Sequence, residues 1–272
     1  MNTLTMFCLS TDPNHLQKIK DFNYLPVGLG ESNFSNDWFQ DNKGENISKK
    51  NKYYGEYTFH YWLWKNHLDK IKENWIGFCQ YRKFWSNENI SLIKSNDHLK
   101  KLILKKIPET HKNAEVILGE ETAVNKFKLM KFLKRGMGLF LKNPSYFFDK
   151  NKRNIKFHFD MWHGEYYLKK AIELLDNNNK GDFENFVNKE TSFHPHNMFI
   201  CKSKQIMENY YETVFPWLKR CEDEFGFENL TGFGQTRIYG FLAERFMSYW
   251  FKKNTKYKTM PIIHFDIGKN NI

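Results

Sequence analysis

The sequence has no apolar run long enough to cross a bilayer, which takes about 18 residues, and no N-terminal signal segment. We therefore expect a cytoplasmic protein that does not span a membrane. Only four cysteines occur, and none of them forms a Cys-x-x-Cys pair. This pattern favours reduced, buried thiols over a disulfide framework. The cysteines are Cys8, Cys79, Cys201 and Cys221.

The common short motifs for zinc and for nucleotide phosphates are missing as well. No His-Glu-x-x-His segment occurs, and Gly28 and Gly30 do not complete a Gly-x-Gly-x-x-Gly. The chain also lacks internal repeats and low-complexity tracts. We therefore expect a single domain over residues 1–272, with a helical insertion at about residues 120–190.

The chain does have positive charge and aromatic rings. Its 272 residues carry a net charge of +11, and aromatic residues make up 18% of the total. A basic chain suggests an anionic partner, such as a phosphorylated substrate, a membrane surface or nucleic acid. The rings recur at helical core spacings rather than interleaved with lysine. That spacing counts against a protein that binds single-stranded nucleic acid by stacking.

Short apolar runs bounded by turn residues predict strands, and longer amphipathic segments between them predict helices. The alternation is typical of an α/β fold with helices flanking the sheet. Pro26 predicts an edge or a bend in the second strand. The strands are expected at Leu4–Ser10, Tyr24–Leu29, Trp75–Gln80, Ala114–Gly119 and Met198–Cys201. The segment Thr259–Phe265 is either a last edge strand or a docked tail. Long helices are expected at about Tyr53–Asn66 and Ser203–Phe225, and a turn at Asn177–Gly181.

Polar and charged residues follow two of these strands. The first strand runs at once into a polar turn, as suits a nucleotide-binding edge. The strand Trp75–Gln80 runs straight into Tyr81, Arg82 and Lys83, which places cationic donors at the carboxyl edge of the sheet. Ligands bind at that edge in open α/β sheets. Arginine and lysine there favour a phosphate or carboxylate group.

The segment before that strand holds further candidate ligand contacts. The loop 31–52 is long for a structureless connection and contains Asp41, Asn42 and Asn46, which serve either as turn formers or as ligand contacts. In the following helix, Tyr54, Tyr57, Tyr61 and Trp64 form one face that we expect to be core. Glu56 is costly to bury unless it is paired, and Lys65 or Arg82 is available as its partner.

Two clusters later in the chain are candidates for acid–base chemistry. Asp160, His163 and Glu165 come together where we expect a loop to enter a helix, although Asp160 also suits a simple helix cap. His196 and Asn197 lead directly into a strand. Arg237 and Arg245 fall in a later helix with Glu244, where a structural ion pair is the stronger interpretation.

The segment Lys126–Lys142 carries six lysines and arginines and no acid. Lys128, Lys131 and Arg135 fall on one side at helical spacing, opposite several apolar residues. This is typical of a basic amphipathic helix on an anionic membrane surface, and also of a surface helix packed on the core.

Several blocks of the sequence, in order, resemble the DUF4422 family of bacterial glycosyltransferases. These are DNKGENIS, NKYYGEYTFHYWLWKN, GFCQYRKF, HNMFICKS with YYETVFPWL, and RIYGFLAERF. The resemblance covers most of the chain outside residues 86–155. It implies a GT-A-like, Rossmann-like mixed sheet and a role in capsule or lipopolysaccharide O-antigen synthesis, and some members transfer galactofuranose. The family usually has histidine where this chain has Gln80, and arginine where it has Lys83. Any catalytic role of that histidine is missing here.

The resemblance implies a nucleotide-sugar donor, a UDP-sugar, and a glycan acceptor that is lipid-linked in such pathways. Many GT-A enzymes hold Mn or Mg with Asp-x-Asp, which this chain lacks; the nearest segments are Asp182–Glu184 and Glu222–Glu224. We expect fixed cations to take over some or all of the role of the metal. The sequence leaves open whether a Mn or Mg ion also binds. The alternative is a non-catalytic nucleotide-sugar or nucleic-acid binding protein. The expected catalytic residues are Asp160, His163 and His196. The expected donor contacts are Asp41, Asn42, Asn46, Glu56, Lys65, Tyr81, Arg82, Lys83, Asn197 and Arg237.

Overall fold

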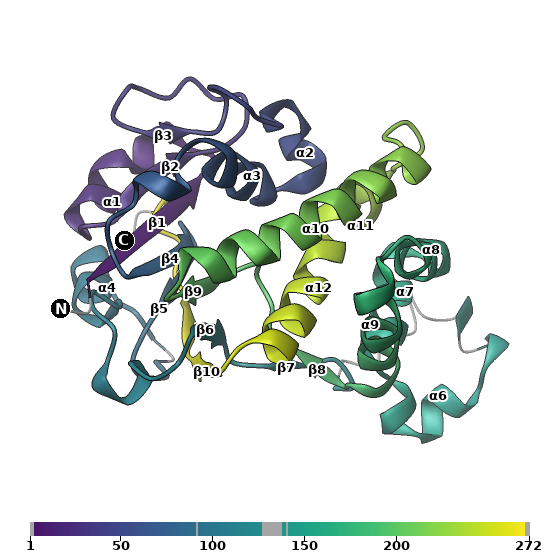
Figure 1. Cartoon of the computed structure of the whole chain (residues 1–272). Helices are drawn as coiled ribbons and strands as arrows, with labels where there is room; N and C mark the ends of the chain where they lie inside the picture. Colours follow the sequence, from purple (N-terminus) through teal and green to yellow (C-terminus); the bar gives the residue numbers. More distant parts are fainter. Residues whose placement is uncertain (1–2, 91, 127–137, 140, 270–272) are drawn as a thin grey trace. The chain divides into compact units, whose positions relative to one another are not determined.

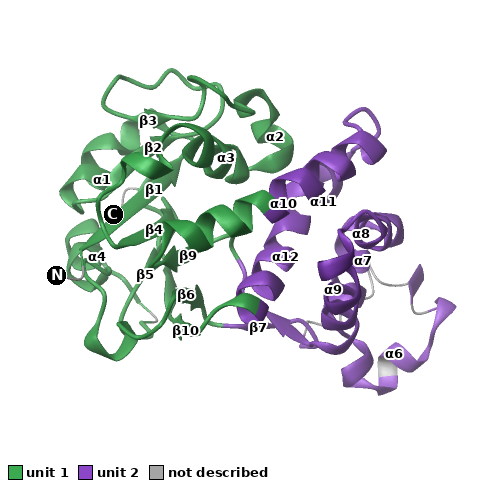
Figure 2. Ribbon diagram, viewed as in Figure 1, with its two compact units in different colours: residues 1–120, 196–212, 254–272 green, residues 121–195, 213–253 purple. Residues whose placement is uncertain are grey.

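A computed structural model describes residues 3–90, 92–126, 138–139 and 141–269 of the chain. The chain divides into two compact units, each built from separate stretches of sequence (Figure 2). Unit 1 consists of residues 1–120, 196–212 and 254–272, and unit 2 of residues 121–195 and 213–253. The expectation of a single domain with a helical insertion stays a prediction.

Unit 1 is built on one nine-stranded mixed sheet, in which seven strands follow the order β10-β6-β9-β4-β1-β2-β3 (Figure 1). Strands β1 to β4 run parallel where they pair, whereas β9 is antiparallel to both of its neighbours, β4 and β6. Strand β5 pairs with β4 and β11. The strands are β1 (Leu4–Ser10), β2 (Leu25–Gly28), β3 (Phe39–Gln40), β4 (Trp75–Gln80), β5 (Lys83–Trp85), β6 (Val116–Gly119), β9 (Phe199–Cys201), β10 (Tyr257–Met260) and β11 (Ile262–His264).

The central strands β1 and β4 are mostly apolar and buried, as is typical of strands in a sheet covered on both faces. Phe7, Phe78 and Cys79 are fully or almost fully buried. Gly77 lies where β4 is crowded on both sides, since a Cβ there would come within 2.9 Å of Met6 and 3.0 Å of Ile200. The predicted strands Leu4–Ser10 and Trp75–Gln80 are confirmed. All four cysteines are free and buried, as expected.

The helices of unit 1 depart from the prediction at one point. The expected helix Tyr53–Asn66 is divided at Gly55, whose φ of 58° is a conformation that glycine adopts most easily. Tyr54 and Tyr57 are buried as predicted, but Tyr61 is only half-buried and the helix after the break is buried around most of its circumference. The helices are α1 (Leu16–Asp21), α2 (Asn51–Tyr54), α3 (Tyr57–Asn66), α4 (Asn96–Leu102) and the first part of α10 (Lys204–Phe225). The 3-10 turns are Pro13–His15, Ser48–Lys50, Leu68–Lys70 and Glu109–His111.

Unit 2 is mainly helical. Its core includes Phe183, Trp217 and Phe246, and the ring centroids of the last two lie 4.8 Å apart. Among the described residues, no helix has both the length and the apolar character that crossing a bilayer requires. Most of the basic segment 126–142 lies outside the described residues. The elements are β7 (Thr122–Ala123), α6 (Ser145–Phe148), a 3-10 turn (Lys150–Lys152), α7 (Ile155–His163), α8 (Glu165–Glu173), α9 (Asn177–Lys189), β8 (Ser192–Phe193), the rest of α10, α11 (Gly232–Thr236) and α12 (Ile238–Asn254).

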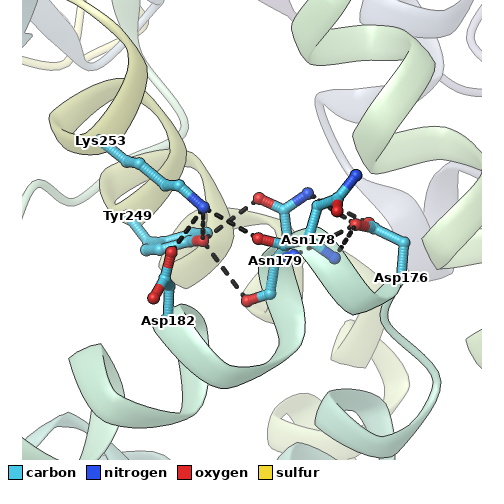
Figure 3. Close-up of polar contacts among 6 residues, drawn as sticks. All are labelled: Asp176, Asn178, Asn179, Asp182, Tyr249 and Lys253. Atoms are coloured by element: carbon cyan, nitrogen blue, oxygen red, sulfur yellow. Dashed lines mark hydrogen bonds and ion pairs between the residues drawn. The ribbon is translucent and has the colours of Figure 1, made fainter.

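The turn predicted at Asn177–Gly181 is wrong, because these residues begin helix α9. Asp176 caps the helix, and its carboxylate accepts hydrogen bonds from the backbone N–H groups of Asn178 and Asn179, both at 3.1 Å (Figure 3). Lys253 of α12 donates to the Asn178 carbonyl at 2.9 Å and pairs with Asp182 at 2.6 Å. A cap and a cross-helix ion pair thus stabilise a segment whose composition is typical of a turn. Asp182, in one of the two segments nearest to Asp-x-Asp, is therefore engaged in an ion pair between helices.

Candidate active site

The sheet of unit 1 has a topological switch point between β1 and β4. The chain leaves β1 to pair β2 on one side and returns to pair β4 on the other. Ligands bind at the carboxyl ends of the strands beside such a switch point in open α/β sheets. We call this region the β1/β4 edge; it comprises Ser10–Asp12 after β1 and Gln80–Lys83 after β4.

Strand β9 brings a third segment to the same edge. Because it is antiparallel to β4, the residues that precede it reach the end of the sheet where β4 finishes. The Gln80 side-chain amide donates to the His196 carbonyl at 3.0 Å and to the Glu56 carboxylate at 3.1 Å. One amide group therefore joins the end of β4, the start of α3 and the approach to β9.

The approach to β9 has unusual backbone geometry. His196 and Asn197 have φ values of 82° and 52°, in the left-handed region that non-glycine residues seldom adopt. Such conformations concentrate at functional sites, where the surrounding structure holds them in place. Gln80 contributes here, because its hydrogen bond to the His196 carbonyl restrains the peptide between these two residues.

His196 and His264 form a pair at the β1/β4 edge, with ring centroids 5.3 Å apart. Lys83 is the register partner of His264 across strands β5 and β11. Burial lowers the pKa of His196 to about 3, and the positive charge of Lys83 adds to this effect. Burial and Lys83 also lower the pKa of His264. Both imidazoles are therefore neutral at neutral pH, beside a fixed cation.

The turn after β1 holds a third histidine. His15 is buried, and its Nδ1 lies 2.8 Å from the Ser10 hydroxyl. Its ring packs 4.9 Å from the ring of Tyr81, whose carbonyl accepts a hydrogen bond from the Ile267 N–H at 3.2 Å. Tyr81 is thus held between the β1 turn and the C-terminal tail. Neither His15 nor His264 was identified from the sequence; the polar turn after β1 was the available signal for His15.

The predicted cations occupy different environments. Arg82 is exposed, and its guanidinium lies 4.5 Å from the centre of the Tyr81 ring. Lys83 is half-buried at the start of β5. Lys65 is near the end of α3, with its ammonium 3.5 Å from the Trp64 ring. It lies about 13 Å along the helix from Glu56, so the hypothesis that Lys65 pairs with Glu56 is wrong.

The three predicted loop residues also separate. Asp41 is almost fully buried, and burial raises the pKa of its carboxyl to about 6, although a hydrogen bond with Thr58 lowers it in part. Its Oδ2 has no hydrogen-bond partner. Asn46 bonds within its own loop, donating to the Gly44 carbonyl at 2.8 Å and accepting from Ser48. Asn42 is exposed. Within the described residues, no three acidic, histidine or cysteine side chains are arranged to hold a metal ion.

In unit 2, Asp160 lies inside α7 rather than at its start, so the expectation of a loop entering a helix there is wrong. The cap of α7 is Asn154, which accepts from the Phe157 N–H at 2.9 Å. Asp160 is buried and pairs with Lys156, one turn earlier. Burial raises the pKa of its carboxyl to about 6, although the pairing with Lys156 opposes this.

The other predicted residues of unit 2 have structural partners. His163 ends α7, and its Nδ1 lies 2.7 Å from the Gly234 carbonyl while its ring stacks 4.3 Å from Phe241. Arg237 lies between α11 and α12, with its guanidinium 5.8 Å from the Phe233 ring. The ion pair of Arg245 with Glu244, which the sequence indicated, is confirmed, and Arg245 is buried.

Comparison with known proteins identifies the family and the fold. The model of a family described as a domain of unknown function, DUF4422, matches residues 13–255. No curated protein matches the chain. The solved structure of the bifunctional glycosyltransferase WbbM, in its apo form, is similar with a TM-score of 0.68 and 19% identity. The similarity covers 97% of this chain and 45% of that one, so this chain spans less than half the length of WbbM. The mannosyltransferase Ktr4p from S. cerevisiae has a TM-score of only 0.37 at 10% identity, over 96% of this chain and 70% of that one.

These matches confirm two expectations. The DUF4422 resemblance inferred from the sequence blocks is confirmed by a match over most of the chain. The expected GT-A-like mixed sheet flanked by helices is confirmed by the strand order and by the similarity to the WbbM fold.

Proposed function

The chain belongs to the DUF4422 family, and from that premise we propose that it is a glycosyltransferase that uses a nucleotide-sugar donor and a glycan acceptor. The observation that carries this proposal is the β1/β4 edge, where Arg82 and Lys83 follow a buried parallel strand at the switch point of a GT-A-like sheet. A UDP-sugar is the donor we favour. Transfer of galactofuranose in capsule or lipopolysaccharide O-antigen synthesis is the finer form of the proposal.

In this proposal, the β1/β4 edge must stabilise the diphosphate that leaves the donor sugar. Negative charge develops on that group as the glycosidic bond to the nucleotide breaks, and fixed cations stabilise it. The Arg82 guanidinium offers a planar fork of donors that matches phosphate oxygens. Its contact with the Tyr81 ring limits the orientations available to it, and His15 in turn packs against that ring. Lys83 adds a second positive charge.

The Gln80 amide organises the remainder of the donor site in this proposal. By bonding both Glu56 and the His196 carbonyl, it holds a carboxylate and the neutral His196–His264 pair at one edge. Carboxylates and neutral imidazoles accept hydrogen bonds from hydroxyl groups. Glu56, as a carboxylate, and Asn197, whose amide both donates and accepts, are our proposed contacts of the donor sugar or ribose, beside the cations that hold the diphosphate.

Within unit 2, Asp160 is the residue that we propose as a general base for a bound hydroxyl group. A general base works best when its pKa lies near the working pH. The pKa of Asp160, raised by burial to about 6, meets that condition better than the pKa of about 3 that burial imposes on His196. His163 is less suitable because its Nδ1 is engaged by the Gly234 carbonyl.

The test is release of UDP by the purified protein from a panel of UDP-sugars that includes UDP-galactofuranose. Each donor is incubated with and without a glycan acceptor, and thermal unfolding is followed with the same donors, because a bound ligand raises the melting temperature. We expect one donor to be turned over and to stabilise the fold. Failure of every nucleotide sugar to be consumed or to stabilise the protein would contradict the proposal.

A further inference from the structure

Unit 2 contains a cavity of about 250 Å³ between the segment around α6 and helices α7, α8 and α9. Its lining includes Asp160, Lys156, Glu165 and Asn188. A nucleotide sugar is larger than the drug-sized ligands that occupy pockets of roughly 300–1,000 Å³. The volume therefore suits a smaller ligand, about the size of one sugar ring.

The charges that line the cavity are balanced. Lys142 pairs with Glu165 at 2.6 Å, and Lys156 pairs with Asp160. A diphosphate or a free phosphate would approach two carboxylates as well as two ammonium groups, and it would gain no net attraction. The balance favours a neutral polar ligand instead.

One carboxylate oxygen in the cavity wall has no hydrogen bond. Asp160 is only 7% exposed, and its Oδ2 is engaged by Lys156, whereas its Oδ1 is buried without a partner. Buried polar atoms are normally hydrogen-bonded, because leaving one unsatisfied is costly. A ligand that donates a hydroxyl hydrogen to Oδ1 would satisfy it.

The remaining lining offers both polar and apolar contacts. The side-chain nitrogen of Asn188 donates a hydrogen bond to the Glu184 carbonyl at 2.8 Å. The side-chain oxygen of Asn143 accepts one from the Ser145 N–H. This arrangement presents an amide oxygen from Asn188 and an amide nitrogen from Asn143. The rings of Tyr146 and Phe157 lie 4.4 Å apart and supply an aromatic surface. A sugar ring carries hydroxyl groups around its rim and apolar C–H patches on its faces, so it can use both kinds of contact.

We propose that this cavity binds one neutral sugar residue of the glycan acceptor, with a hydroxyl hydrogen-bonded to Oδ1 of Asp160. The identification of the bound sugar as part of the acceptor rests on the proposed transferase function. Sugar binding by unit 2 does not depend on that function.

The direct test is saturation-transfer NMR of the full chain with the methyl glycosides of galactose, glucose and mannose, and with inorganic phosphate as a competitor. We expect transfer to at least one methyl glycoside, no displacement by phosphate, and a loss of signal in Asn188→Ala and in Tyr146→Ala. Asn185→Ala is the matched control, because Asn185 is an exposed asparagine on the same helix and is not among the cavity residues. Absence of transfer from all three glycosides, displacement by phosphate, or equal signals in Asn188→Ala and the wild type would overturn the inference.

Kinetics separate this inference from the proposed function. Loss of one neutral hydrogen bond should raise the acceptor KM of Asn188→Ala by about threefold to tenfold, while the donor KM stays at the wild-type value. Turnover of a UDP-sugar by a protein that binds no methyl glycoside would refute the cavity proposal alone. Binding of a glycoside by a protein that consumes no nucleotide sugar would leave the sugar site intact and refute the transferase.

Discussion

Replacement of Arg82 by alanine tests the proposed diphosphate contact directly. The Arg82 side chain is exposed and packs over the Tyr81 ring, while its backbone carbonyl accepts a hydrogen bond from the Phe265 N–H at 3.1 Å. The backbone contact persists in Arg82→Ala. We therefore expect a change in folding stability of about 0.5 kcal/mol or less, which shifts Tm by about 2 °C or less in a protein of this size.

The effect on transfer should be much larger. A hydrogen bond to a charged group contributes about 1.5–3 kcal/mol, and a guanidinium fork makes two such bonds to a phosphate. Solvent exposure of Arg82 favours the lower end, a loss of about 3 kcal/mol for the pair, which corresponds to about a hundredfold fall in kcat/KM. Arg82→Lys should recover little of this, because a single ammonium cannot reproduce the bidentate geometry.

The assay is UDP release from the preferred donor, together with UDP binding by titration calorimetry and the Tm of each variant. Lys100→Ala removes an exposed positive charge from α4 of the same unit and serves as the control for net charge. Arg82→Ala should lose UDP affinity and turnover, and Lys100→Ala should lose neither. Wild-type turnover by a folded Arg82→Ala protein would rule out the role assigned to Arg82.

Three further predictions concern metal, pH and membranes. Because the chain lacks Asp-x-Asp, we expect appreciable transfer in EDTA; a complete loss that Mn restores would direct attention to Asp41 and Glu56 as ligands. The raised pKa of Asp41 means that its folded form holds a proton up to about pH 6, so ionisation should destabilise the fold as pH rises from about 4 through 6. Urea unfolding should show that the free energy of unfolding falls less between pH 5 and pH 8 in Asp41→Asn than in the wild type. An equal fall in both proteins would refute this. Co-sedimentation with anionic liposomes should fade with salt, since each basic residue near such a surface contributes about 1 kcal/mol. It should also fall in a variant with glutamine at four positions of the 126–142 segment, whereas unchanged sedimentation would assign that segment to an ordinary packed helix. These positions are Lys128, Lys131, Lys134 and Arg135.

Local sequence was a poor guide where neighbours outside the segment decide the conformation. Asn177–Gly181 has turn composition, yet the Asp176 cap and Lys253 of α12 stabilise it as a helix. Asp160 was a candidate helix cap, but Asn154 takes that role six residues earlier. Gly55 divides the aromatic helix because its positive φ ends α2, whereas periodicity alone predicts one continuous helix.

The sequence by itself determined the buried strands and the cations that follow them. Apolar runs of strand length bounded by polar residues are local signals, so Leu4–Ser10, Trp75–Gln80 and the position of Arg82 were all predictable. Only the tertiary structure decided that β9 lies antiparallel beside β4, and that Gln80 therefore reaches both His196 and Glu56. Pairing between strands more than 100 residues apart depends on the packing of the whole sheet, and no spacing in the sequence encodes which end of a strand meets which partner.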